Sequence, residues 1–135
     1  PERRPVPCVV PRGAVAGGQR KVCALAMVRD GTTKCILFSE KALDTDNCAT
    51  AFCGDDNEGY TAGFDHDTMR HTGFEPQQDS QRSGTWYGDY RFGAAHPATL
   101  NMVMVDGSVQ SVYYGIDLTI WRRLGHRDDG KQVEY

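Results

Sequence analysis

The stretch HPATLNMVMVDGSVQSVYY, residues His96 to Tyr114, predicts the central hairpin of the fold. The apolar run 100–105 predicts a strand, and residues 108–114 predict a strand that returns beside it. Between them, Asp106-Gly107 is a turn sequence, because glycine adopts positive φ angles without steric strain. The stretch therefore indicates two antiparallel strands joined by a tight turn.

A two-residue turn at Asp106-Gly107 also fixes the expected register of the two strands. It places Val105 opposite Ser108 and Val103 opposite Gln110. After the hairpin, Asp117 predicts an N-cap for a helix with the sequence LTIWRRL, and Gly125 predicts its end. On that helix Ile120, Trp121 and Leu124 share one face, which is expected to cover the sheet.

A second hairpin is expected upstream, around Asp30-Gly31. Two apolar runs, residues 21–28 and 34–40, flank this turn sequence. Both runs are apolar at successive positions, which predicts strands covered on both faces. Ala, Leu and Met in the first run also suit a helix, but the turn and its Ile-Leu-Phe partner favour strands.

Together these elements predict an α+β, mainly β fold. We expect an antiparallel sheet of four or more strands built from hairpins, long ordered loops between 42 and 90, and one short C-terminal helix. The 135 residues suit one globular domain over 1–135, in which 1–20 form an irregular lead-in. Since the chain begins without Met, we expect it to be a fragment or a processed product.

The overall charge and hydropathy limit the classes of partner. The net charge of −3 argues against nucleic acid as a general partner. No apolar run reaches the roughly 20 residues that span a bilayer, and no signal peptide is visible in the chain.

Five cysteines are scattered through this small, glycine-rich chain without a C-x-x-C pattern: Cys8, Cys23, Cys35, Cys48 and Cys53. That usage favours an oxidising compartment, outside the cell or in the periplasm. Cys48 and Cys53 lie close enough to close a local loop, and two of the other three could form a second bridge. Five cysteines allow 15 ways to form two bridges, so the pairing stays open, as does the alternative of five reduced, buried thiols.

The residues from 42 to 69 hold seven carboxylates and no Lys or Arg, and they form the best candidate for a metal site. Calcium binds six to eight oxygen atoms, often supplied by loops. The ligands we expect for it are Asp44, Asp46, Asp55, Asp56 and Glu58. The spacing is not that of an EF-hand, and the alternative is a solvated acidic surface.

His96 and Asp106 could in principle serve as a general base and the group that orients it. A strand over 100–105 would span roughly 20 Å and hold them apart, and no nucleophile signature accompanies them. We therefore expect no catalytic site. Instead, Asp106-Gly107 turns the hairpin, and His96 anchors the entry to the strand, with Glu40 at the end of the first hairpin as a candidate partner.

Two other groups of residues are candidates for binding. His66 and His71 lie near Asp65 and Asp67, but their spacing suits no common metal site, and surface histidines are the expected outcome. Four aromatic residues could bind a sugar or a protein partner, or else complete the core: Trp86, Tyr87, Tyr90 and Phe92.

These motifs resemble the prepilin-associated domain defined by a His, nine residues and Asp-Gly, here His96 and Asp106-Gly107. The segments VRDGTTKCILFSEKAL, GDDNEGYTAGFDHDTMR and IDLTIWRRLGHRDDG extend the resemblance over most of residues 26 to 130. Members of that family are abundant in planctomycetes, and their biochemical function is described as unknown.

The resemblance implies the exported, non-enzymatic head of a pilin-like protein or of a type II secretion pseudopilin. The long N-terminal helix typical of such proteins is absent from this chain and would supply any membrane contact. The implied partners are further copies or other pilin-like subunits at the cell surface. The alternative is an extracellular binding module that uses the acidic loop and the loop aromatics to hold a glycan or a protein.

Overall fold

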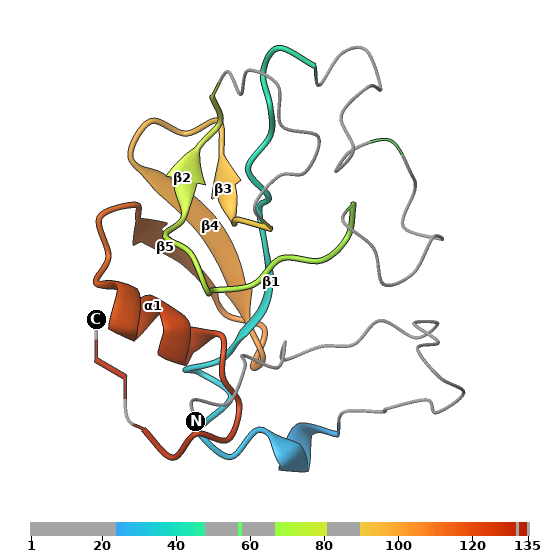
Figure 1. Ribbon diagram of the computed structural model, residues 1–135. Helices are drawn as coiled ribbons and strands as arrows, with labels where there is room; N and C mark the ends of the chain where they lie inside the picture. The colour runs from blue at the N-terminus through green and yellow to red at the C-terminus, as the bar shows by residue number, and fades with distance from the viewer. Residues whose placement is uncertain (1–23, 48–56, 58–66, 81–89, 132, 135) are drawn as a thin grey trace.

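A three-stranded antiparallel sheet in the order β1-β4-β5 forms the body of the protein, with one short helix packed against it (Figure 1). A separate pair of short parallel strands, β2 and β3, lies beside it. The computed structural model describes residues 24–47, 57, 67–80, 90–131 and 133–134. This architecture confirms the predicted α+β, mainly β class, although the antiparallel sheet of the described residues has three strands and not the expected four or more.

The elements follow one another in the chain as a 3-10 helix, five strands and an α-helix. Their bounds are η1 Leu25–Met27, β1 Ile36–Ser39, β2 Gln77–Gln78, β3 Gly93–Ala94, β4 Thr99–Met104, β5 Val109–Tyr113 and α1 Leu118–Leu124.

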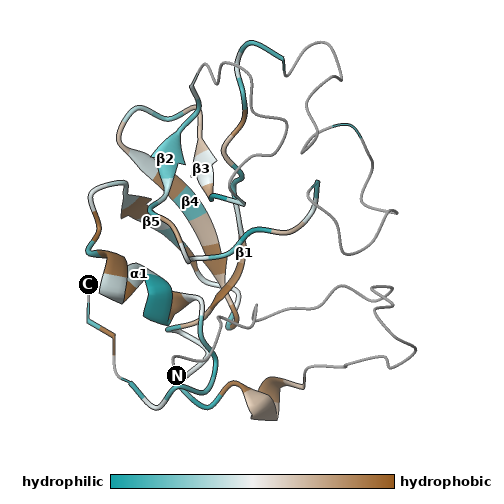
Figure 2. Cartoon of the chain, in the orientation of Figure 1, coloured by the Kyte–Doolittle hydropathy of each residue, from teal (hydrophilic) through white to brown (hydrophobic). Residues whose placement is uncertain are grey.

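The central strand β4 alternates strictly between a buried and a more exposed face. Leu100, Met102 and Met104 point into the core and are almost completely buried. Trp121 and Leu124 of α1 belong to the same core cluster, so the helix covers this face of the sheet. Figure 2 shows the apolar residues of β4 and β5 beside the helix. The opposite face, which we call the open face, carries Thr99, Asn101 and Val103 on β4 and Val109, Ser111 and Tyr113 on β5.

The hairpin formed by β4 and β5 is confirmed, but its predicted register is wrong by one residue. Val103 pairs with Val109, not with Gln110. Gly107 N donates to Met104 O at 2.9 Å and Met104 N donates to Ser108 O at 2.8 Å, so three residues form the loop. A two-residue type I′ turn needs positive φ at both central residues, whereas only Gly107 has it here, at 87°. The loop therefore has the geometry of a turn closed by a left-handed glycine.

The predicted upstream hairpin is wrong. Residues 25–27 form an exposed 3-10 helix, and β1 pairs with β4. The turn at Asp30-Gly31 does form, with Gly31 at a φ of 101°. The carboxylate of Asp30, however, accepts hydrogen bonds from Asp129 N at 2.7 Å and Gly130 N at 2.8 Å. This turn therefore binds the C-terminal turn and does not join two strands. The Ala-Leu-Met run before it favours a helical conformation.

A bulge in β1 determines which of its side chains face the core. Ile36 pairs with Met104 and Phe38 pairs with Val103, with a register shift between them. The extra residue reverses the alternation, so Ile36 is buried while Phe38 lies on the open face, 62% exposed. Glu40, two residues further on, follows Phe38 onto the open face and lies beside Asn101.

The predicted capping of α1 is confirmed at its N-terminus. The Asp117 carboxylate accepts hydrogen bonds from Thr119 N at 2.8 Å and Ile120 N at 3.1 Å, which lowers the pKa of Asp117. At the other end, Gly125 follows the helix as expected but has a φ of −86°. A close approach requires glycine here instead, since a Cβ at position 125 would lie 2.1 Å from Thr72 Oγ1.

Gly125→Ala should lower the free energy of unfolding by about 1–3 kcal/mol, because the new methyl group overlaps the Thr72 side chain. Thr72→Ala removes the two nearest atoms and leaves only Cβ, at 3.0 Å. The decrease in free energy of unfolding of the double variant should therefore be smaller than the sum of the two single decreases. The difference, measured by urea denaturation, should be about 1 kcal/mol.

Gly130→Ala is the matched control for this cycle. Its position has a positive φ of 73°, and a Cβ added there would meet no atom within 4 Å, so strain and not overlap destabilises it. Its loss should add to that of Thr72→Ala. If the losses in free energy of unfolding were additive with Thr72→Ala for Gly125→Ala as well as for Gly130→Ala, the close approach of Gly125 to Thr72 would be contradicted.

Candidate functional site

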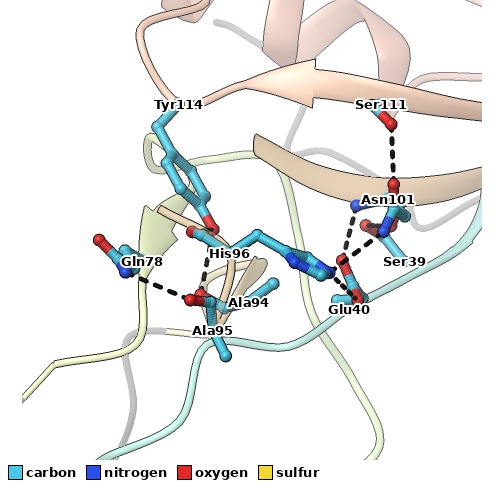
Figure 3. Close-up of polar contacts among 9 residues, drawn as sticks. All are labelled: Ser39, Glu40, Gln78, Ala94, Ala95, His96, Asn101, Ser111 and Tyr114. Atoms are coloured by element: carbon cyan, nitrogen blue, oxygen red, sulfur yellow. Dashed lines mark hydrogen bonds and ion pairs between the residues drawn. The ribbon is translucent and has the colours of Figure 1, made fainter. Parts of the chain in front are cut away.

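His96, the first residue of the His-to-Asp-Gly pattern, belongs to a polar cluster on the open face of the sheet (Figure 3). The polar cluster consists of Glu40, His96, Asn101 and Ser111 on this face, together with Ser39, which is paired with Met102 and reaches the backbone carbonyl of Asn101. These residues come from the end of β1, from the connection between β3 and β4, and from β4 and β5. Four segments of the chain therefore contribute to one set of contacts.

Glu40 completes the sheet at the point where β1 ends. Its carboxylate Oε2 accepts a hydrogen bond from Asn101 N at 2.6 Å, and its own N–H donates to Asn101 O at 3.3 Å. The Ser39 hydroxyl donates to the same carbonyl at 2.9 Å. The carboxylate thus replaces the backbone acceptor that a longer β1 would supply to the amide of Asn101.

His96 lies against this pair, as proposed from the sequence. Its Nε2 is 3.5 Å from Glu40 Oε1 and 3.4 Å from Asn101 Nδ2. A single nitrogen either donates to the carboxylate or accepts from the amide, so the tautomer of the ring decides which contact forms. The backbone of His96 is held as well, because the Tyr114 hydroxyl lies 3.0 Å from its carbonyl and 3.1 Å from that of Ala94. The ring therefore fastens the start of β4 to the end of β1.

Asp106 and Gly107 lie at the other end of β4 from His96. The Asp106 carboxylate accepts hydrogen bonds from the Ser108 hydroxyl at 2.7 Å and from Ser108 N at 2.9 Å. These bonds lower the pKa of Asp106, the hydroxyl contributing most. Asp106 shapes the turn, and the strand between the two residues keeps it away from His96.

The polar cluster lacks the arrangement that activates a nucleophile. The Ser111 hydroxyl donates to Asn101 Oδ1 at 2.8 Å, and the Ser39 hydroxyl donates to a backbone carbonyl. Nucleophilic catalysis would need a hydroxyl that donates to the imidazole. What these contacts can do is hold strands together at a surface.

Only part of the acidic segment can be placed. Asp44 is buried, and its two oxygens accept hydrogen bonds from Asp46 N at 3.0 Å and Asn47 Nδ2 at 2.8 Å. Asp46 is exposed, while Asp55, Asp56 and Glu58 lie outside the described residues. The structure brings no group of three metal-ligating side chains together within its described part. Calcium binding stays a prediction.

Cys35, directly before β1, is completely buried and disulfide-bonded. The other candidate cysteines lie outside the described residues: Cys8, Cys23, Cys48 and Cys53. The bond fixes the chain at the start of β1, next to the bulge that directs Phe38 and Glu40 to the open face.

The aromatic residues considered for binding serve different purposes where they can be placed. Phe92 packs edge-on against Trp121, with ring centroids 5.6 Å apart, and so completes the core. Tyr90, at a φ of 53°, stacks on His71 at 5.6 Å. Trp86, Tyr87 and His66 lie outside the described residues.

His71 forms an aromatic group that sequence analysis missed. Phe74 approaches the imidazole as well, at 5.4 Å between centroids, and the guanidinium of Arg91 lies 5.1 Å from the Phe74 ring. His71 Nδ1 accepts a hydrogen bond from Gly73 N at 3.1 Å. No sequence periodicity could indicate this group, because Tyr90 joins it from a distant segment.

Comparison with known proteins gives one match. Residues 11–119 match the model of a family described as "Protein of unknown function (DUF1559)", a range that includes all five described strands. No curated protein and no solved structure matches the chain. In the described residues, no helix is both long and apolar enough to cross a membrane.

Glu40→Ala should lower the free energy of unfolding by about 1–2 kcal/mol, because it leaves the partly buried amide of Asn101 without an acceptor. Glu40→Gln keeps an oxygen in place and should lose less. His96→Gln removes only an exposed pair and should lose under about 1 kcal/mol. Equal losses for Glu40→Ala and His96→Gln in urea denaturation would contradict the role given to the carboxylate.

Burial lowers the pKa of the His71 imidazole below its usual value of 6.5. Below pH 6.5 the unfolded chain therefore binds a proton that the folded chain resists. As a result, the free energy of unfolding should decrease as the pH falls from 6.5 through the lower folded pKa. His71→Gln should remove this part of the pH dependence. An imidazole pKa at or above 6.5 in an NMR titration would contradict the assignment.

Proposed function

The chain belongs to the DUF1559 family, and on that premise we propose that it is the exported, non-enzymatic head of a pilin- or pseudopilin-like protein. In this proposal the head has a structural role in a cell-surface filament or a secretion apparatus. Its partners are further copies or other pilin-like subunits, and membrane contact comes from an N-terminal helix outside this sequence.

The observation that carries the proposal is the open face of the sheet. Phe38, Val103 and Val109 pair across the three strands and form an apolar row. Phe38 is 62% exposed and Val109 is 69% exposed, and Tyr113 on the same face is 65% exposed. Large side chains that gather on one exposed surface are typical of protein contacts. An assembly role gives this face a function.

Three further observations support an exported structural protein. The disulfide bond at Cys35 favours an oxidising compartment. The hydroxyls of the polar cluster donate to Asn101 and so join neighbouring strands, which supports a structural role. The net charge of −3 argues against nucleic acid as a partner.

To test the proposal, the full gene is expressed in the organism that carries it, and its product is located with an antibody against this chain. We expect immunogold label at the cell surface, and we expect the protein in the material sheared from cells. Phe38→Ser should reduce the sheared fraction severalfold at an unchanged total amount, because it removes the largest exposed apolar side chain of β1.

Leu25→Ser is the matched control for Phe38→Ser. Leu25 is a large apolar residue with 70% exposure, but it lies on η1 and not on the sheet. Its substitution should leave assembly unchanged. Retention of the wild type inside the cell would reject an exported role. Surface protein that is never assembled, but binds a glycan or another protein, would favour a binding module instead.

A further inference from the structure

The outer edge of β5 presents backbone groups that point away from the sheet. β5 is a terminal strand of the β1-β4-β5 sheet, at the margin away from β1 (Figure 1). Ser108 O accepts from Met104 N at 2.8 Å and Tyr114 N donates to Ala98 O at 3.1 Å, so even-numbered residues direct their backbone groups toward β4. In an antiparallel pair these groups alternate in direction. The odd-numbered residues Val109, Ser111 and Tyr113 therefore direct theirs outward.

Within the described part of the chain, these outward groups form few hydrogen bonds. Among the described residues, no backbone hydrogen bond is formed by Val109 or Ser111 on this side. The carbonyl of Tyr113 accepts from Ile116 N at 3.1 Å, but its amide is directed outward like the others. A row of unpaired amides and carbonyls is a template for another strand.

β5 also lacks the features that usually protect a sheet edge. Its sequence VQSVY contains no charge, proline or glycine, and its pairing with β4 runs without a register shift from Val109 to Tyr113. β1, at the other edge, has a bulge, and Glu40 and Lys41 follow it directly. Natural sheets use bulges and charges to prevent edge pairing. The contrast indicates that one edge is protected and the other is left open to a partner.

We propose that two copies of this chain pair through β5, edge to edge and antiparallel, about a two-fold axis at Ser111. With that axis, Ser111 lies opposite Ser111 of the second copy, and Val109 lies opposite Tyr113. The amides of Ser111 and Tyr113 on one copy then meet the carbonyls of Ser111 and Val109 on the other. The amide of Val109 meets the Tyr113 carbonyl, which already accepts from Ile116 N and offers its second lone pair. The strand is complementary to itself in hydrogen bonding.

The same register matches the side chains on the open face. Each exposed Val109 meets the exposed Tyr113 of the other copy, a pairing of β-branched and aromatic residues that stabilises antiparallel strands. Because β5 carries no charge, the two copies do not repel each other at the contact. The two three-stranded sheets become one continuous sheet, in which the apolar row of Phe38, Val103 and Val109 continues onto Tyr113 of the second copy.

A second copy fits this edge because the two-fold register places each exposed Val109 opposite an exposed Tyr113 and brings no charged residue of β5 into the contact. The inference goes beyond the pilin-like function and does not depend on it, since a binding module could dimerise in the same way. If the surface-localisation experiment failed, the proposed dimer would still stand. If the dimer were not found, the proposed exported role would still stand.

The test combines mass measurement with cross-linking of the complete 135-residue chain. Light scattering after size-exclusion chromatography should show a molar mass that increases with protein concentration and approaches that of a dimer. Under mild oxidation, Ser111→Cys should give a covalent dimer on a non-reducing gel, because the Cα atoms of such a pair lie about 5.5 Å apart. Ser108→Cys is the matched control, since its copies would lie roughly 20 Å apart along the strands.

Two lysine substitutions separate the edge from the rest of the open face. Val109→Lys should weaken the dimer at least tenfold in dissociation constant. Phe38→Lys, on the far strand of the same face, should leave it nearly unchanged. Thermal melting checks that each variant is folded, and wild type treated with oxidant accounts for the native cysteines.

Three results would overturn the proposal. The first is a wild type that stays monomeric up to about 1 mM. The second is equal cross-linking of Ser111→Cys and Ser108→Cys, which indicates random collision. The third is a dimer that withstands Val109→Lys, which indicates another surface.

Discussion

The position of β4 between two antiparallel neighbours is the constraint on which the rest of the structure depends. Every second residue of this strand, Leu100, Met102 and Met104, must enter the core, where Trp121 and Leu124 meet them. A slip of one residue would expose this whole set to water. The three-residue loop after Met104 fixes the register with β5, and the bulge in β1 fixes it on the other side.

Both faces of the sheet follow from that register. On the inner face, the helix α1 completes the core, and Gly125 lets the chain pass close to Thr72 as it leaves the helix. On the open face, the bulge directs Phe38 and Glu40 outward, where one joins the apolar row and the other accepts a hydrogen bond from Asn101. The polar cluster therefore holds together the same strands that present the apolar row, which keeps this exposed face in a fixed shape.

Local sequence rules succeeded where one short segment holds all the determinants. The cap at Asp117, the strand at 99–104 and the turn at Gly107 each depend on neighbours within a few residues. The same rules failed where two structures satisfy the local pattern. The run before Asp30 had both strand and helix features, and its expected partner β1 paired instead with a segment more than sixty residues away. The register of the β4–β5 hairpin failed because Asp-Gly suits both a two-residue and a three-residue loop.

The sequence by itself determined the central hairpin, the capped helix after it, and the separation of His96 from Asp106. The alternation of side chains along a strand and the capping of a helix depend only on residues close together in the sequence. It also suggested Glu40 as the partner of His96, which lies 3.5 Å away in the structure. Only the tertiary structure decided which residues of β1 face outward, how His71 meets Phe74 and Tyr90, and which sheet edge stays open. These features depend on contacts between segments that are distant in the chain, and the energy of such contacts is not encoded in any single stretch.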